Sequence, residues 1–490
     1  MASTGIAAPR TVVSPRVAAD LVAAVGDEGV LQRPEEMLVY ECDGYMVERS
    51  LPDLVVFPTS TEQVVEVVKI CNRHGLPFVP RGAGTSLAGG TLSIGGGVTI
   101  CLTRMKRILE VSIRDRYAIV ETGLVNVFLT RSLAGTGFHY APDPSSQGAC
   151  TIGGNVATNS GGPHTLKYGV TVNHIRGVTL VMPDGEVVET GGVVEDQPGY
   201  DLTGVIVGNE GTFGIATKAI VNLTRDPEAG RTFLAVFDTV DAATETVSGI
   251  IAAGIVPAAL EMLDNLMIQA VEAAFGFGFP TEAGAVLIIE IDGVEAGLES
   301  ESRRVAAVVE GRGGAIQRSI SWRTRKEPEY VAIWKSRKSA FGAIGRLSPT
   351  YCTQDGVVPR TKLPEILRFM VDVGRRHGLR IANVFHAGDG NIHPILLYDE
   401  RKPEEVRSVL TASHEILDKC IELGGSVTGE HGIGVEKMEF MPKLFTPADL
   451  AAMTALRNTF NPLGRCNPSK LLPGGGGCVE KTGPRRPAPA

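Results

Sequence analysis

Three histidines and one glutamate stand in two glycine-rich turns in the C-terminal half of the chain. His386 and His393 enclose a turn-forming run that begins Ala-Gly-Asp-Gly, and Glu430 and His431 lie in the run Gly-Glu-His-Gly-Ile-Gly. Two imidazoles and a carboxylate form a ligand set for a divalent ion such as Zn, Mn or Fe, with positions left open for a substrate. The remaining imidazole, His431, could act as a general base. A lone loop histidine is usually structural, but three of the nine histidines gather here, which favours a chemical site.

A glycine-rich loop in the N-terminal half has the composition of a phosphate-binding turn. Residues 80–90 contain the run Pro-Arg-Gly-Ala-Gly-Thr-Ser-Leu-Ala-Gly-Gly, which gathers backbone N–H groups among few side chains. Thr85 and Ser86 add hydroxyl donors, and Arg81 adds a positive charge. The spacing fits neither the Walker pattern, which requires Gly-Lys-[Ser/Thr], nor the Rossmann pattern Gly-x-Gly-x-x-Gly that opens a helix. Taken alone, such a loop is as often an ordinary turn.

The elements expected around this loop form a strand–helix–strand unit. Residues 55–58 are expected as a strand, Ser60 as an N-cap and residues 62–74 as a helix with one apolar face. Gly75 ends the helix, and residues 78–80 start a second strand that leads into the loop. This arrangement places the glycine-rich turn at the end of a buried strand.

The rest of the chain suggests two further regions. From residue 95 to 222, short β-type runs alternate with glycine-rich turns, which is typical of an α+β domain. Residues 151–162 hold too many glycines and asparagines for a core helix or strand, so we expect a loop that closely approaches a ligand. Asp226-Pro227 is a plausible boundary. A helix-covered antiparallel sheet is then predicted from strands at 232–237 and 285–291 and helices at 242–253 and 264–274.

Composition limits the class of protein. With 490 residues the chain exceeds the usual size of one core, so two domains are expected. The net charge of −8 argues against a nucleic-acid partner. The eight cysteines form no Cys-x-x-Cys pair, which disfavours a metal cluster and suggests a cytoplasmic protein with free thiols. No apolar run is long enough to span a membrane, although peripheral docking at its inner face stays open.

Five motifs in order resemble the FAD-binding domain of vanillyl-alcohol-oxidase-type flavoproteins, from about Leu51 to Arg225. They are the loop at 80–90, Pro142-Asp-Pro-Ser-Ser146, residues 151–162, Lys167-Tyr-Gly169 and Gly208-Asn-Glu-Gly-Thr-Phe-Gly-Ile215. In that family the first loop wraps the pyrophosphate, residues 151–162 line the isoalloxazine and ribityl chain, and the last motif approaches the adenine. The first loop has no histidine, so we expect FAD to be held non-covalently.

The resemblance carries a set of expected flavin contacts onto this sequence. Asn467, in the closing run Asn-Pro-Leu-Gly-Arg-Cys-Asn-Pro-Ser-Lys, is one of them, and Ser469 stands where the family usually has glycine. The other expected cofactor-binding residues are Pro80, Arg81, Gly82, Ala83, Gly84, Thr85, Ser86, Pro142, Asp143, Ser145, Gly148, Thr151, Gly153, Gly154, Asn155, Asn159, Gly161, Gly162, Tyr168, Glu210, Gly214 and Ile215.

The C-terminal half resembles FAD-linked 2-hydroxy-acid oxidases and dehydrogenases. In that family His386, His393 and Glu430 would hold the metal, and His431 would be the base. Composition alone favours a solvated basic face for residues 334–338. The resemblance instead implies that Arg337 binds the substrate carboxylate, and a planar guanidinium is suited to that role. The run Arg-Lys-Ser-Ala-Phe, where many relatives have an acidic second residue, resembles the branch formed by the flavin-bearing D-type subunits of bacterial glycolate oxidases.

These resemblances imply an enzyme. The expected reaction is oxidation of glycolate to glyoxylate or of D-lactate to pyruvate, by metal-assisted removal of the hydroxyl proton and hydride transfer to flavin N5. A dehydrogenase for D-2-hydroxyglutarate or another D-2-hydroxy acid is the nearest alternative. A non-catalytic flavin-binding scaffold subunit is an alternative of another class, and it predicts broken metal ligands.

The resemblance also implies partners and a domain plan. Electrons would leave to a second flavin subunit and an iron–sulfur subunit, or directly to a quinone or cytochrome. The expected fold is α+β, a two-part FAD-binding domain with a helix-covered antiparallel cap. The expected divisions are an N-terminal arm (1–50), the FAD-binding domain (51–226), the substrate and metal cap (227–440), a C-terminal segment that returns to the FAD-binding domain (441–472) and a disordered tail (473–490).

Overall fold

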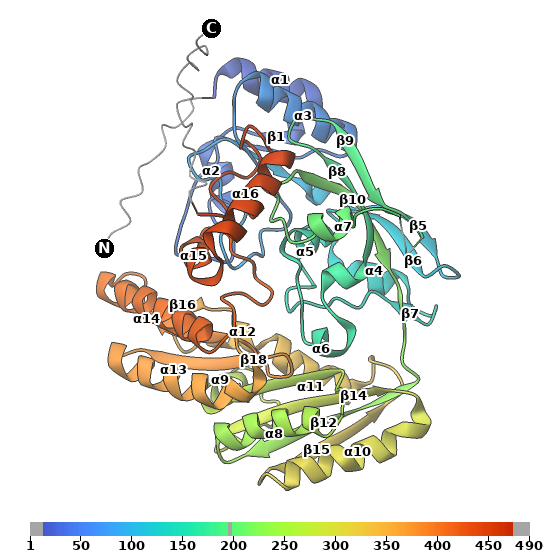
Figure 1. Cartoon of the computed structure of the whole chain (residues 1–490), viewed down its shortest axis with the longest axis vertical. Helices are drawn as coiled ribbons and strands as arrows, with labels where there is room; N and C mark the ends of the chain where they lie inside the picture. Colours follow the sequence, from blue (N-terminus) through green and yellow to red (C-terminus); the bar gives the residue numbers. More distant parts are fainter. Residues whose placement is uncertain (1–12, 195–197, 474–490) are drawn as a thin grey trace.

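The computed structural model describes residues 13–194 and 198–473, so residues 474–490 of the predicted tail lie outside the described part. Two smaller sheets form the N-terminal region, and one large sheet forms the region that follows it (Figure 1). No helix within the described residues is long and apolar enough to cross a membrane. The seven cysteines among those residues are all free.

The first sheet contains the predicted strand–helix–strand unit. Its strand order is β1-β2-β4-β3, with β2, β4 and β3 parallel. Ser60 caps the helix that follows β2 by accepting a hydrogen bond from the Gln63 N–H (3.3 Å), as predicted. The elements are α1 (Pro15–Val25), β1 (Val30–Leu31), α2 (Pro34–Met37), β2 (Leu54–Val56), α3 (Thr61–Arg73), β3 (Phe78–Arg81) and β4 (Val98–Cys101).

The second sheet is antiparallel, in the order β5-β6-β10-β8-β9. Its central strand β10 alternates buried and half-buried residues, so one face packs inward. A short pair, β7 with β11, lies outside this sheet. The elements are β5 (Ile108–Ser112), β6 (Tyr117–Glu121), α4 (Asn126–Ser132), β7 (Phe138–His139), α5 (Ile152–Thr158), α6 (Thr165–Tyr168), β8 (Ile175–Val181), β9 (Val187–Gly191), α7 (Leu202–Ile206), β10 (Ile215–Asn222) and β11 (Thr224–Arg225).

The expectation that residues 151–162 form no helix is wrong, because residues 152–158 form α5. Thr151 caps this helix by accepting from the Gly154 N–H (3.2 Å), and Asn159 ends it in the left-handed conformation (φ +51°). Gly153 does not break the helix. It lets the helix pack closely on Thr122, whose Cβ would lie 2.7 Å from any added Cβ.

The large sheet has the order β15-β12-β14-β13-β18-β19-β17, and β16 and β20 extend it beside β18. Helices α8, α10, α13 and α14 cover one face, and α9, α11 and α12 cover the other. The predicted helix-covered antiparallel sheet is therefore confirmed. The elements are β12 (Ala229–Phe237), α8 (Val240–Ala252), β13 (Ala259–Asp264), α9 (Asn265–Phe275), β14 (Ala285–Gly293), α10 (Glu295–Glu310), β15 (Ala315–Trp322), α11 (Pro328–Lys338), α12 (Ala340–Ile344), β16 (Thr350–Thr353), β17 (Gly356–Val357), α13 (Leu363–His377), β18 (Arg380–His386), β19 (Asn391–Ile392), β20 (Pro394–Tyr398) and α14 (Pro403–Glu422).

The C-terminal segment carries α15 (Met441–Leu444) and α16 (Pro447–Phe460) and then contacts the N-terminal region (Figure 1). The Phe78 N–H donates to the Arg465 carbonyl (2.9 Å), so the segment pairs with the edge of β3. The buried Asn461 amide donates to the carbonyls of Thr212 (3.0 Å) and Cys466 (2.8 Å). One side chain thus joins the end of α16 to the first region.

Replacing Asn461 should loosen this attachment. In Asn461→Ala the carbonyls of Thr212 and Cys466 lose a buried donor, so we expect the free energy of unfolding to fall by about 1–3 kcal/mol. Urea unfolding followed by circular dichroism measures the change. The control is Asn458→Ala on the exposed face of α16, which should change stability by less than about 0.5 kcal/mol. Equal effects of the two variants would contradict the proposed attachment.

Candidate functional site

A cavity of about 350 Å³ lies between the N-terminal region, which contains the two smaller sheets and is called the first region below, and the large-sheet region. The first region contributes the glycine-rich loop, α5 with its flanking residues, and the segment at 209–216. The large-sheet region and the loop after it contribute Lys338, Phe341, Tyr351, His393, Glu430 and His431. Three residues of the second predicted group, His393, Glu430 and His431, therefore share one cavity with the glycine-rich loop, whereas His386 lies outside its lining.

The glycine-rich loop meets the requirements of a phosphate cradle. The backbone N–H groups of residues 83–87 donate no hydrogen bond within the described part of the chain, so they are free to bind a ligand. A Cβ on Gly84 would overlap the Arg81 guanidinium, so only glycine fits there. Arg81 itself donates to the Thr91 hydroxyl (3.0 Å) and the Cys42 carbonyl (3.0 Å), and these hydrogen bonds stabilise the loop.

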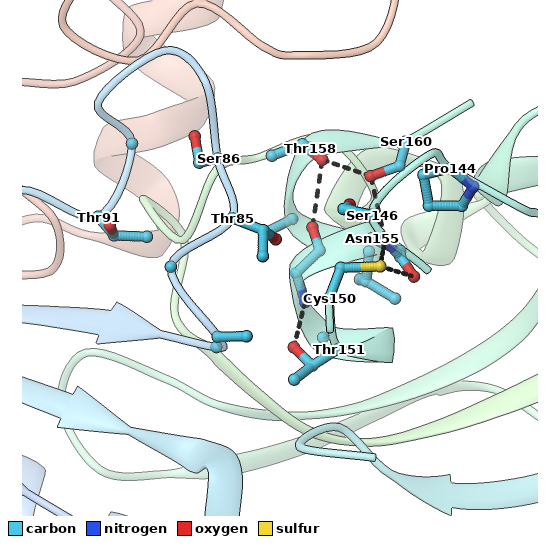
Figure 2. A pocket seen from close by; sticks show the side chains of 18 of the residues that line it. Thr85, Ser86, Thr91, Pro144, Ser146, Cys150, Thr151, Asn155, Thr158 and Ser160 are labelled. Carbon is cyan, nitrogen blue, oxygen red and sulfur yellow. Dashed lines mark hydrogen bonds between the residues drawn. The ribbon is translucent and has the colours of Figure 1, made fainter. Parts of the chain in front are cut away.

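The opposite wall, around α5, offers neutral hydrogen-bonding groups (Figure 2). Thr158 donates to the Gly154 carbonyl (3.2 Å) and shares a hydrogen bond with Ser160 (2.8 Å). The Asn155 amide contacts Cys150 Sγ (3.4 Å) and the Ser160 hydroxyl (3.2 Å). Hydroxyls and backbone amides on both walls suit a ligand that combines phosphates, a polyol chain and a flat heteroaromatic ring, as FAD does.

The structure brings most of the predicted flavin contacts into this cavity. Those that line it are Pro80, Arg81, Gly82, Ala83, Gly84, Thr85, Ser86, Ser145, Thr151, Gly153, Gly154, Asn155, Glu210, Gly214 and Ile215. Those outside its lining are Pro142, Asp143, Gly148, Asn159, Gly161, Gly162, Tyr168 and Asn467. Asn467 donates instead to the carbonyls of Gly90 (3.0 Å) and Glu210 (2.6 Å). Ser469, at the family's glycine position, has φ +61°, a conformation that glycine adopts without strain.

The predicted metal ligands converge. The rings of His386, which ends β18, and His393, which follows β19, lie 5.2 Å apart. Glu430 Oε1 lies 3.2 Å from His386 Nε2 and 3.5 Å from His393 Nε2. Both His393 ring nitrogens and Glu430 Oε2 are buried without a hydrogen-bond partner in the described residues. One ligand atom from each of the three residues lies within 4.8 Å of the others, and this cluster with its unpartnered atoms fits a divalent cation.

Asp355 forms a second possible set with His393 and His431, but its oxygens are already used. Its carboxylate accepts from the Thr428 hydroxyl (2.7 Å) and from the N–H groups of Gly429 (3.0 Å), Glu430 (3.2 Å) and His431 (2.9 Å). A carboxylate that receives so many hydrogen bonds has little capacity left for a metal. The geometry therefore favours the set of His386, His393 and Glu430, as the sequence predicted.

The surroundings of His386 and His431 shift the pKa values of these two histidines in opposite directions. Burial disfavours the charged form of His386, but Glu261 and Glu430 outweigh it and raise its pKa well above the usual value. Burial would raise the pKa of Glu430, yet His386 lowers it to about 2. Burial and His393 lower the pKa of His431 to about 4, although Asp355 opposes them. The carboxylates thus stabilise positive charge between them, while His431 is neutral at pH 7 and able to accept a proton.

Arg337 is fully buried, so the solvated basic face that composition favoured is wrong for this residue. Its Nε donates to Glu261 Oε2 (2.7 Å), and Glu261 Oε1 lies 2.7 Å from His386 Nδ1. Its two terminal nitrogens have no hydrogen-bond partner in the described residues. Lys338, rather than Arg337, lines the cavity, and its Nζ donates to Asp143 Oδ2 (3.2 Å).

The sequence analysis missed two buried carboxylates that organise the site. Glu261 orients His386 from β13, a strand that was not predicted because its buried Glu261 and its terminal Asp264 interrupt the apolar pattern. Asp355 lies directly before β17 and holds the loop that carries Glu430 and His431. The signal for Glu261 was one acidic residue in an apolar run, and the signal for Asp355 was one acidic residue before a glycine. Each is too common to single out a site residue.

The two regions correspond to two domain families. Residues 52–191 match the model of an FAD binding domain, and residues 226–471 match the C-terminal domain of FAD linked oxidases. Together with the cradle described above, the first match makes this chain an FAD-binding flavoprotein. The chain belongs to the FAD-linked oxidase family, as its motifs indicated.

Curated relatives cover nearly the whole chain. The glycolate oxidase subunit GlcD of Escherichia coli (strain K12) is 42% identical over 451 residues, which are 92% of this chain and 90% of that protein. GlcD of Bacillus subtilis (strain 168) is 39% identical over 453 residues, 92% and 96% of the two chains. A D-lactate dehydrogenase of Anaerostipes hadrus is 32% identical over 446 residues, 89% and 91%.

Solved structures confirm the fold. A substrate-bound p-cresol methylhydroxylase superposes with a TM-score of 0.79 at 17% identity and covers 94% of this chain and 98% of its own. The 4-ethylphenol oxidase of Gulosibacter chungangensis has a TM-score of 0.76 at 18% identity and covers 95% and 99%. The predicted vanillyl-alcohol-oxidase-type architecture is therefore confirmed.

Removing the charge of Glu261 should destabilise the protein strongly. Glu261→Gln leaves the buried Arg337 without its counterion, so we expect the free energy of unfolding to fall by about 3–5 kcal/mol. Urea unfolding measures this change. The exposed pair of Glu422 with Lys419 supplies the control, because Glu422→Gln should cost less than about 1 kcal/mol. If the two substitutions cost the same, Glu261 is not the required counterion.

Proposed function

We propose that this chain oxidises a small 2-hydroxy acid, glycolate or D-lactate, with non-covalently bound FAD and a divalent cation. The observation that carries the proposal is that His393, Glu430 and His431 line the same cavity as the glycine-rich loop. A hydride acceptor and a proton acceptor could therefore meet one substrate carbon and its hydroxyl. The intact metal-ligand set argues against a non-catalytic scaffold.

The residues divide the chemistry between them. The residues that line the cavity would hold FAD, which would supply a hydride acceptor, and His386, His393 and Glu430 would hold a cation, which would supply a Lewis acid for the substrate oxygens. The neutral His431 takes the hydroxyl proton as the Cα–H bond breaks and the carbonyl forms. The buried walls of the cavity exclude water from these atoms.

Arg337 is the proposed anchor for the substrate carboxylate. Its Nε is fixed by Glu261, and its two terminal nitrogens are buried without partners. Paired N–H donors of a guanidinium match the two oxygens of a carboxylate.

The size of the substrate separates the alternatives. Glycolate and D-lactate share the hydroxy-acid group that these residues address, and relatives named for each lie at 42% and 32% identity. D-2-Hydroxyglutarate adds a second carboxylate, which would require a further cation in the cavity. Lys338 is the cavity cation in the large-sheet region, and Asp143 already contacts it, so we favour the smaller acids.

The reduced flavin must pass its electrons on. We propose a second flavin subunit and an iron–sulfur subunit as acceptors, because the GlcD relatives are named as subunits of an oxidase. A quinone or cytochrome is the alternative acceptor.

The first test is anaerobic reduction of the bound flavin. Glycolate or D-lactate should bleach the absorbance near 450 nm, and His431→Ala should slow bleaching by about 10²-fold or more while the flavin stays bound, because the proton acceptor is lost. The control is His414→Ala, an exposed histidine that pairs with Glu439 away from the cavity. A His431→Ala variant that bleaches at the normal rate would refute the assigned base, and bleaching by neither acid would refute the substrate class.

The second test measures metal binding directly. Isothermal titration of Mn²⁺ into chelator-treated, flavin-bound protein should give one site. Glu430→Gln should raise the Kd for Mn²⁺ at least about 10-fold. Substituting a residue that only orients a metal ligand already weakens metal binding by that factor, and Glu430 is a proposed ligand itself. Glu439→Gln, at an exposed position farther along the chain, should leave the Kd unchanged. An unchanged Kd in Glu430→Gln would exclude the proposed ligand set.

A further inference from the structure

The loop that carries Glu430 and His431 is bound by a carboxylate from the FAD-binding domain. Glu210 Oε1 accepts the Ile433 N–H (2.7 Å), and Glu210 Oε2 accepts the Gly434 N–H (2.7 Å). The side chain is buried, although it stands at the wall of the flavin cavity. Both of its oxygens are thus committed to the loop.

Glu210 is itself held rigidly from the flavin side. Its backbone adopts the left-handed conformation (φ +52°), which is uncommon for a residue with a side chain. Its N–H donates to the Ala157 carbonyl in α5 (2.8 Å), and its carbonyl accepts from the Asn467 amide (2.6 Å). A strained conformation that neighbours fix from two sides points to a specific task for the side chain.

The loop approaches the FAD-binding domain as closely as glycine allows. Gly432 has φ +84°, and an added Cβ would lie 2.8 Å from Glu210 Oε1. A Cβ on Gly434 would overlap the Ala88 carbonyl in the phosphate-binding loop. That carbonyl also accepts the Val435 N–H (2.9 Å). Residues 432–435 are therefore bound to two segments that line the flavin cavity.

The other half of the loop is bound from the large-sheet region, where Asp355 accepts the N–H groups of residues 429–431. Asp355 thus fixes the loop to the proposed metal site, and Glu210 fixes it to the flavin cradle. The His431 N–H is bound to Asp355, and the N–H groups that Glu210 binds begin two residues later. The position of His431 relative to both cofactors depends on both contacts.

We propose that Glu210 is a positioning residue for catalysis, which sets the distance of His431 and Glu430 from the flavin. This role rests on the proposed function and differs from the flavin contact that the sequence predicted for Glu210. The physical reason is that a displacement of about 1 Å in reacting groups can cost about 10²-fold in rate. Loss of the contact should therefore lower kcat far more than it raises KM.

The test substitutes Glu210→Gln in the flavin-bound enzyme. The amide retains one acceptor, but its NH₂ group faces an N–H of the loop and repels it. We expect kcat to fall by about 10–100-fold with KM changed less than about threefold and the flavin content unchanged. Hydrogen exchange followed by mass spectrometry should show the peptide that contains Ile433 and Gly434 exchanging about tenfold faster.

The control is Glu439→Gln, which lies near this loop in the sequence but pairs with the exposed His414. It should change neither kcat nor exchange in residues 429–436. Unchanged kcat and exchange in Glu210→Gln would overturn the proposal. Loss of flavin from Glu210→Gln would also overturn it, because that outcome makes Glu210 a cofactor-binding residue.

A second variant covers the case in which Glu210→Gln does not fold. Gly432→Ala disturbs the same contact from the loop side, because the added Cβ would meet Glu210 Oε1. This variant should show the same faster hydrogen exchange and the same lowered kcat, with the flavin still bound. Normal exchange and kcat in Gly432→Ala would contradict the proposal. Exchange is measured without substrate, so it reports on the contact even if neither glycolate nor D-lactate reduces the wild-type flavin.

Discussion

The site depends on buried carboxylates that bind backbone N–H groups of a single loop. An ionised carboxylate is costly to bury unless hydrogen bonds or cations satisfy its oxygens. Asp355 and Glu210 meet this condition by receiving the N–H groups of the segment from Gly429 to Gly434. The same bonds satisfy backbone donors that a glycine-rich turn cannot pair within itself. The loop therefore has one stable conformation only while both regions of the chain enclose it.

A second contact between the two regions is ionic. His164, next to α6, lies 2.9 Å from Asp143 and 3.4 Å from Glu290 of β14. Burial opposes its charge, but the two carboxylates raise the pKa of His164 to about 9. Lys167 and Tyr168 bind Asp292, which follows Glu290 on the same strand by two residues. These ionic contacts therefore join the N-terminal region to the large-sheet region at a second place, between residues more than 120 positions apart in the sequence.

The sequence predicted those parts of the molecule whose signal is local. Periodicity and capping identified α3, and glycine content with hydroxyl residues identified the loop that lines the cavity. The failure at α5 has a clear cause, since Gly153 allows close helix packing on Thr122 and does not reverse the chain. The residues that were missed, Glu261 and Asp355, act through side-chain partners at least 36 positions away in the sequence. No pattern within one segment could have paired them.

The arrangement around Glu261 shows why these long-range partners matter to the chemistry. Its two oxygens contact His386 Nδ1 and Arg337 Nε, both at 2.7 Å. Hydrogen bonding to a carboxylate at Nδ1 fixes the orientation of the ring and leaves Nε2 facing Glu430, as a metal-binding histidine requires. The same carboxylate fixes the plane of Arg337, whose remaining N–H groups are the proposed anchor for the substrate. One buried side chain thus orients both the proposed metal ligand His386 and the proposed substrate anchor Arg337.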